Sequence, residues 1–190
     1  DDYFSIDAIA AEDERVPLVA KLDVPRLGFL DPANSHEDLP NGSKIELPLW
    51  LGETLHTKKM FVVNLPKHYN ARFQEHLEAG PASTNLREHC SNYFTVGEVL
   101  SRVKGDDELQ KKLRMAFSGE RFKRIMDLAF SSHNQDVREE SQLFTDLERQ
   151  LFDAGYRGVH ELLEWKSRKQ RTLTASSAVQ GPNAKRLKLS

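Results

Sequence analysis

The sequence has a single cysteine, Cys90, among its 190 residues. One thiol excludes a disulfide within the chain and agrees with a reducing compartment. No apolar run approaches the ~20 residues that a membrane-spanning helix needs. The ten glycines are scattered, and neither a G-x-G-x-x-G loop nor a G-K-[ST] loop, which would cradle phosphates, is present. These absences argue against a disulfide-stabilised, a membrane-spanning or a nucleotide-binding protein.

Side chains that bind metals or catalyse reactions are present, but their spacing is unfavourable. His68 and His76 are eight positions apart, so they do not share a helical face as zinc ligands three or four positions apart would. His89 adjoins Cys90, and neighbouring residues rarely present a base and a nucleophile to one reacting atom. We therefore expect no catalytic residue, no metal ligand and no cofactor, and a small hydrolase that uses Cys90 is the weakest alternative.

Charge is divided unequally along the chain. It has 27 Lys and Arg against 29 Asp and Glu, but Trp165 is followed by seven Lys and Arg and by no acid. The residues up to Trp165 therefore carry 20 basic against 29 acidic side chains, a net charge of −9. Because phosphate binding depends on clustered cations, this part of the chain is a poor general clamp for DNA.

The last residues form a basic segment of another kind. Residues 171–190 have few large apolar side chains, which predicts a disordered tail. Within it, Lys185, Arg186 and Lys188 follow Pro182, a pattern typical of a monopartite nuclear localisation signal. We expect a nuclear protein; a solvated tail without a function and a weak nucleic-acid contact are the alternatives.

Proline and glycine divide the rest of the chain into two regions. Five of the eight prolines fall in the first 48 residues, where they separate short apolar segments typical of strands joined by turns, although a short helix at 6–11 is equally consistent. From residue 47 the pattern is helical. The predicted fold is α+β and mainly α, with a small β-rich domain at 1–46, a helical bundle domain at 47–170 and a disordered tail at 171–190.

The boundaries of the predicted helices depend on capping signals. Pro48 and Pro66 suit the first position of a helix, and Thr95 with Glu98 has the spacing of a capping box. The expected helices are 49–60, 66–80, 95–105, 106–132, 135–153 and 158–169.

The helix expected at 106–132 is apolar on most sides. At about 100° per residue, Leu109 and Leu113 lie on one side, and Met126 and Phe130 fall largely on the other. Such a helix is buried on most sides, and its three arginines suit a buried or interface carboxylate. We expect a surface that contacts other chains; a central bundle helix with arginines that reach solvent is the alternative. The interface candidates are Arg114, Phe117, Arg121, Phe122, Arg124, Ile125 and Met126.

A second apolar stripe follows the first. Leu143, Leu147 and Leu151 recur every four residues, and Leu162 and Trp165 extend the stripe beyond two glycines. With the preceding helix, it amounts to more apolar surface than the chain can bury by itself.

Four segments together resemble a known family. Residues 25–29 (PRLGF), 42–51 (GSKIELPLWL), 121–127 (RFKRIMD) and 147–155 (LERQLFDAG) are similar, in order and spacing, to the Psf-three family of subunits of the eukaryotic GINS complex. The resemblance runs from about Phe4 to Trp165. It implies a non-catalytic subunit with a small β-rich domain first, which assembles with three related subunits through their helical domains.

The resemblance also implies partners and residue roles. The tetramer would join the Mcm ring and a Cdc-type partner in the replicative helicase, the CMG assembly, with DNA contacted only indirectly or weakly and with no membrane or small-molecule substrate. The central helix would pack on sister subunits, and its motif residues would either touch a partner or fill the subunit's own core; they are Arg121, Phe122, Arg124, Ile125, Met126 and Asp127. Packing between the domains would involve Leu47, Pro48, Leu49 and Trp50. The alternative, from another class, is a nucleic-acid-binding module that uses the basic tail.

Overall fold

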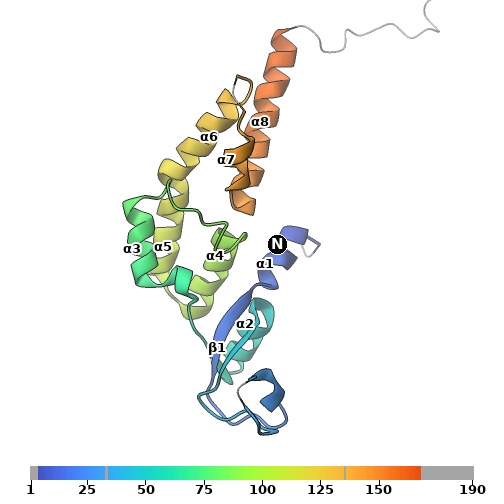
Figure 1. Ribbon diagram of the computed structural model, residues 1–190, viewed down its shortest axis with the longest axis vertical. Coiled ribbons are helices and arrows are strands. Elements are labelled where there is room, and N and C mark those ends of the chain that lie inside the picture. Colours follow the sequence, from blue (N-terminus) through green and yellow to red (C-terminus); the bar gives the residue numbers. More distant parts are fainter. Residues whose placement is uncertain (1–3, 33, 135, 168–190) are drawn as a thin grey trace, which may run out of the picture.

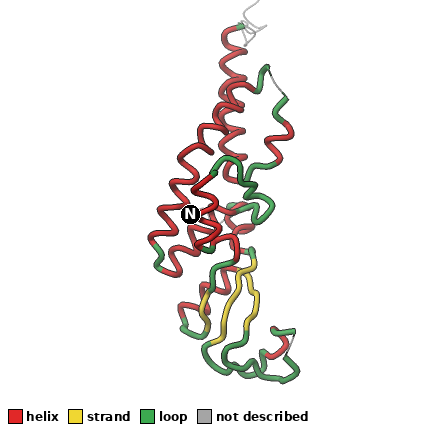
Figure 2. Tube along the Cα trace, turned by 60° about the vertical axis from the view of Figure 1, so that its left-hand side comes forward, coloured by secondary structure: helices red, strands yellow, loops and turns green. Residues whose placement is uncertain are grey.

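The structure, a computed structural model, describes residues 4–32, 34–134 and 136–167. The molecule is elongated, with a small sheet at one end, a cluster of helices in the middle and two helices side by side at the other end, one of them the longest described (Figure 1). A Cα trace from a second direction shows the same order of parts (Figure 2). The fold is α+β and mainly α, as predicted.

The sheet has three antiparallel strands in the order β2-β1-β3. These are β1 (Arg15–Ala20), β2 (Lys44–Pro48) and β3 (Phe61–Val63). Alternate residues of β1 are buried, including Val16 and Leu18. Helix α2 (Leu49–Thr57) follows β2 directly and packs on the sheet so closely that a Cβ built on Gly52 would lie 3.3 Å from Val16.

The sheet extends past the boundary that we expected between residues 46 and 47. Strand β3 lies beyond it and pairs with β1, and α2 lies between them in sequence and on the sheet in space. At this junction Leu47 and Leu49 are buried, Pro48 is half-buried and Trp50 is half exposed. The tail expected at 171–190 is outside the described residues.

The other helices occupy the rest of the chain. They are α1 (Ile6–Glu12), α3 (Ala71–Ala79), α4 (Tyr93–Lys104), α5 (Asp107–Ala116), α6 (Phe122–Ser131), α7 (Arg138–Gln142) and α8 (Asp146–Lys166), with short 3₁₀ turns at Gly28–Leu30 and Lys67–Tyr69.

Two stacked tyrosines lie at the centre of the main core. The rings of Tyr69 and Tyr93 are 4.6 Å apart and both side chains are fully buried. Each hydroxyl donates to a main-chain oxygen, Tyr69 to Tyr93 at 2.7 Å and Tyr93 to His68 at 3.0 Å. Burial therefore costs neither ring a hydrogen bond, and the 3₁₀ turn before α3 is fixed to α4.

Several predicted helix boundaries were wrong. The helix expected at 135–153 is divided into α7 and the first turns of α8, and the helix expected at 66–80 is a 3₁₀ turn followed by α3. The helix expected at 106–132 is broken by a π-type segment at Phe117–Arg121, where Gly119 has φ −84° and ψ −124°, outside helical geometry. Helix α8 runs without a break through Gly155 and Gly158, which we had taken as an interruption. The capping box is at Thr145 rather than at Thr95, because α4 already begins at Tyr93.

Candidate subunit-interaction surface

Helices α6 and α8 lie side by side and run in the same direction (Figure 1). Near the start of each, Arg121 bonds to Glu148, and farther along a Cβ built on Gly155 would lie 3.0 Å from the Cβ of Ala129. Gly155 is therefore required for the close approach of the two helices. The two helices begin at about the same level, and α8 is the longer one. The last turns of α8 therefore project past the end of α6.

A buried ion pair joins the two helices at their starts. Arg121 is 6% exposed and Glu148 is 1% exposed. The guanidinium of Arg121 donates from Nε to Oε1 of Glu148 at 2.5 Å and from Nη2 to Oε2 at 3.1 Å. This bidentate arrangement is the geometry that arginine, rather than lysine, provides.

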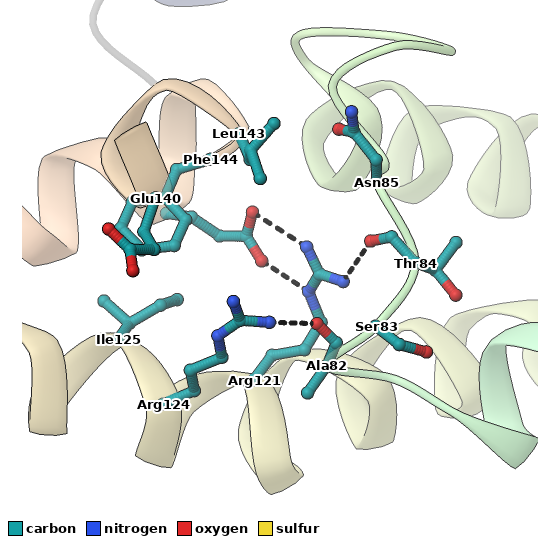
Figure 3. Close-up of a pocket in the computed structure, with 11 residues that line it drawn as sticks. Ala82, Ser83, Thr84, Asn85, Arg121, Arg124, Ile125, Glu140, Leu143 and Phe144 are labelled. Atoms are coloured by element: carbon teal, nitrogen blue, oxygen red, sulfur yellow. Dashed lines mark hydrogen bonds and ion pairs between the residues drawn. The ribbon is translucent and has the colours of Figure 1, made fainter. Parts of the chain in front are cut away.

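The same two side chains fix the neighbouring segments. Oε2 of Glu148 accepts hydrogen bonds from the main-chain N–H and the hydroxyl of Thr145, both at 2.9 Å, and so caps α8. Nη1 of Arg121 donates to the main-chain oxygen of Pro81 and to that of Thr84, the second of which is drawn in Figure 3. The network holds the start of α8, the start of α6 and the loop at 80–84 in one arrangement.

Beside the network, apolar side chains of both helices are exposed or half-buried. On α6, Arg121, Ile125 and Ala129 face α8, and Phe122, Met126 and Phe130 lie about a quarter turn away.

On α8, Glu148 and Gly155 face α6. A second stripe lies about a quarter turn away in the opposite sense. It consists of Leu147, Leu151, Leu162 and Trp165.

The two stripes lie on the same side of the pair. In parallel helices, a quarter turn forward on one and a quarter turn back on the other point to one side. The Cε of Met126 agrees with this, because it would lie 3.7 Å from a Cβ on Gly155. We call the combined surface the apolar face. It consists of Phe122, Met126, Phe130, Leu147, Leu151, Leu162 and Trp165.

The chain itself covers the apolar face unevenly, since Met126 and Leu151 are half-buried and the other five residues are exposed. Phe130 is 54% exposed, and Trp165, on the projecting end of α8, is 67% exposed. At the other end the apolar face leads into a hollow of about 270 Å³ between α4, α5 and the start of α8, lined by apolar residues that include Phe94, Phe117 and Leu147. A contiguous apolar patch of this kind marks a site of protein–protein contact.

The predicted interface residues divide into four groups. Phe122 and Met126 belong to the apolar face, and Arg114 and Phe117 line the hollow at its end.

Arg124 is exposed and donates to the main-chain oxygen of Ala82 at 2.6 Å. Arg121 and Ile125 point into the chain, 6% and 1% exposed. The carboxylate that we expected on a neighbouring chain for Arg121 is supplied by Glu148 of the same chain.

The list of candidates omitted the most exposed parts of the surface, Phe130, Leu162 and Trp165. The apolar stripe at 147–165 has a spacing of three and four residues, and this spacing could have identified Leu162 and Trp165 as part of the surface. The break that we assumed at Gly155 and Gly158 separated that stripe into two short pieces.

The described residues offer little for chemistry. Over those residues, no group of three His, Cys, Asp or Glu could hold a metal ion, and no helix is long and apolar enough to cross a membrane. Cys90 is buried, and burial, followed by the nearby Glu14 carboxylate, raises the pKa of its thiol to about 11. The thiolate that a nucleophile requires is therefore strongly disfavoured at neutral pH.

Comparison with known proteins gives matches over both parts of the chain. A model of the PSF3 N-terminal domain matches residues 4–57, and a model of the GINS complex protein helical bundle domain matches residues 68–166. The first match also passes the boundary that we expected at residue 46.

Full-length relatives are similar to the chain as well. The DNA replication complex GINS protein PSF3 of Xenopus laevis is 33% identical over 184 residues, which are 95% of this chain and 87% of that protein. The protein of the same name from Mus musculus is 32% identical over 189 residues, with the same coverage. The Schizosaccharomyces pombe protein is 25% identical over 172 residues, which are 87% of this chain and 98% of that protein.

Proposed function

The chain belongs to the PSF3 family of GINS complex subunits, which act in DNA replication, and we propose that it is a non-catalytic subunit of a heterotetramer. Its three partners are the sister GINS subunits. The tetramer joins the Mcm ring and the Cdc-type partner and acts as a scaffold of the CMG helicase in initiation and elongation of replication.

The observation that carries this proposal is the apolar face. Five of its seven side chains are more than a third exposed, and they follow one side of the α6–α8 pair. Burying such side chains is worth roughly 1.5–3 kcal/mol each, enough in sum to hold subunits together. Membership of this family indicates that the chains that cover the apolar face are sister subunits.

The charges of the chain support a scaffold more than a DNA-binding protein. The residues up to Trp165 have a net charge of −9, which repels a polyanion. Of the cations that a nucleic-acid-binding function would use, Lys111 is engaged with Glu108 at 3.0 Å. DNA contact is therefore indirect or weak.

Paired substitutions test the role of the apolar face. Phe130→Asp places a charge on the face, and Phe29→Asp places the same charge on an equally bulky ring that is 77% exposed in the 3₁₀ turn at Gly28–Leu30, outside the face. Co-expressed with the three sister subunits, the Phe130 variant should lose most of the 1:1:1:1 complex, because the charge must be desolvated at the interface. The Phe29 variant should retain it.

Equal recovery of the complex with both variants would remove the apolar face from the interface. Circular dichroism of each variant distinguishes a loss of the complex caused by the changed face from one caused by misfolding. Both rings are exposed, so neither substitution should change helical content.

Nuclear localisation is a separate proposal. Lys185, Arg186 and Lys188 lie outside the described residues, so their sequence pattern alone supports it. Replacing the three by Ala in a fluorescent fusion should release the protein into the cytoplasm. Unchanged nuclear import would show that entry depends on diffusion or on a sister subunit.

A further inference from the structure

A hollow beside α3 has a composition that differs from the rest of the surface. We call it the α3 hollow. It is lined by Lys67, Asn70, Arg72, Phe73, His76, Thr84 and His89. Two of these side chains are cations and two are imidazoles, and none is an acid. In a region whose net charge is −9, such a concentration of positive and donor groups needs an explanation.

The two cations of the α3 hollow have no ion-pair partner within the part of the chain that the structure describes. Neither Lys67 nor Arg72 is within 4.0 Å of a carboxylate oxygen there. Glu75 lies one turn after Arg72 and does not pair with it. Elsewhere on α3 the pattern is ordinary, since Glu78 is bridged by Lys112 at 3.1 Å. The hollow therefore has two charges available for a ligand.

The imidazole of His89 is held in place by its neighbours. The edge of Phe73 meets it at 5.1 Å between ring centroids and 88°, and His68 stacks beneath it at 6.2 Å and 13°. Burial, followed by the nearby His89, lowers the pKa of His68. The ring contacts with Phe73 and His68 orient the imidazole of His89, whose ring N–H can donate to a ligand.

The segment that carries His89 and Thr84 is fixed as well. Thr84 donates its hydroxyl to Gly80 at 3.1 Å, and its main-chain oxygen accepts from the buried Arg121 at 2.8 Å. The hollow is thus assembled from α3, the turn before it and a loop that the ion-pair network fixes. Preorganised donors lose little freedom when they bind an anion.

We propose that the α3 hollow binds a phosphorylated serine or threonine of a partner protein. Two cations with additional N–H donors match the charge and the oxygens of a phosphate dianion, which arginine meets with two parallel hydrogen bonds. The hollow, at about 570 Å³, also has room for residues that flank the phosphate. A nucleic acid fits less well, because its backbone would bring many further phosphates along an acidic surface.

The test uses the full chain in the form in which it purifies, with or without associated subunits, so the result does not depend on the proposed assembly. The probe is a fluorescent pool of short peptides with one central phosphoserine and randomised flanks, measured by anisotropy. The same pool without phosphate and a single-stranded oligonucleotide of equal labelling are the comparisons. We expect binding of the phosphorylated pool alone, with displacement by inorganic phosphate.

Variants locate the binding. Arg72→Glu should weaken it about tenfold or more, because a charge-assisted hydrogen bond is lost and repulsion is added. Arg72→Gln should give a smaller loss. Both should fold, since position 72 is exposed in the first turn of α3, where an acid is favourable. Arg157→Glu is the matched control, an exposed helical arginine far along α8, and should bind as the unchanged chain does.

Three results would overturn the proposal. They are equal binding of the unphosphorylated pool, equal loss with the Arg72 and Arg157 variants, and tighter binding of the oligonucleotide than of the phosphorylated peptides. The last would assign the α3 hollow to nucleic acid.

Discussion

Replacing Arg121 by Met should strongly destabilise the folded chain, because Arg121 is half of a buried ion pair. Met fills much of the same volume but leaves the Glu148 carboxylate, 1% exposed, without its cation. Breaking a buried ion pair by removing one partner costs about 3–5 kcal/mol. Arg121 also loses its bonds to Pro81 and Thr84, so the loop at 80–84 should loosen.

A matched arginine lies one turn farther along. Arg124 is exposed, and its one hydrogen bond goes to the main-chain oxygen of Ala82. Arg124→Met should therefore cost less than about 1 kcal/mol, as exposed polar contacts do. For a domain of this size the Arg121 variant should melt about 10 °C lower than the Arg124 variant.

A double-mutant cycle separates the pair from its surroundings. Glu148→Leu should lower the free energy of unfolding as much as Arg121→Met does through the broken ion pair, and by about 1 kcal/mol more because the cap on α8 is also lost. The double variant Arg121→Met, Glu148→Leu should cost much less than the sum, because no buried charge is left uncompensated. Thermal and urea unfolding of the full chain, in one common oligomeric form, provide the four free energies.

Additive costs would refute the reasoning, since they would mean that the two side chains do not stabilise each other. So would an Arg121→Met variant that melts within a degree or two of the Arg124→Met variant.

Three further predictions concern Cys90 and two helical glycines. The pKa of the Cys90 thiol rises on folding from its ordinary 9.0 to about 11. Its contribution to stability is therefore fully present below pH 9 and is lost as the pH rises through 11. Alkylation of this thiol by iodoacetamide at pH 8, followed by mass spectrometry, should proceed at the rate of unfolding. Gly97→Ala should destabilise by about 1–3 kcal/mol, because the new Cβ would lie 2.6 Å from Leu113, and a melting point equal to that of the unchanged chain would contradict this packing. Gly158→Ala should stabilise α8 by up to about 1 kcal/mol, since nothing lies within 4 Å of its Cβ position in the chain alone, and a lower melting point of the chain alone would be the contrary result.

The sequence predicted the parts of the fold that have strong local signals. Strand β2 ends at Pro48, which is also the N-cap of helix α2 and has a φ close to the value of about −65° to which proline is restricted. Helix α4 ends at Gly105, which adopts φ +66°, as a C-terminal glycine commonly does. At such positions a single residue type determines the local geometry, so no tertiary information is needed.

The missed features depend on contacts between distant segments. Strand β3 has three residues, too few to show an alternating pattern, and it exists because β1 offers an edge to pair with. Helix α8 continues through Gly155 because that glycine lets α6 approach, a benefit that outweighs the low helix propensity of glycine. In both cases the decisive partner lies more than twenty residues away in sequence.

The candidate surface shows the same limit at the level of single side chains. Sequence periodicity identified an excess of apolar surface, and the structure has such a surface on α6 and α8. Periodicity could not assign Arg121, because an arginine within an apolar face meets a carboxylate equally well inside its own chain or in another. A Thr-x-x-Glu signature at Thr145 was present in the sequence, but a capping box predicts only that Glu148 turns back to its own helix start. Only the parallel packing of α6 on α8 brings that carboxylate to Arg121, and this internal pairing leaves the apolar stripes, a quarter turn away on one side of the pair, for other chains.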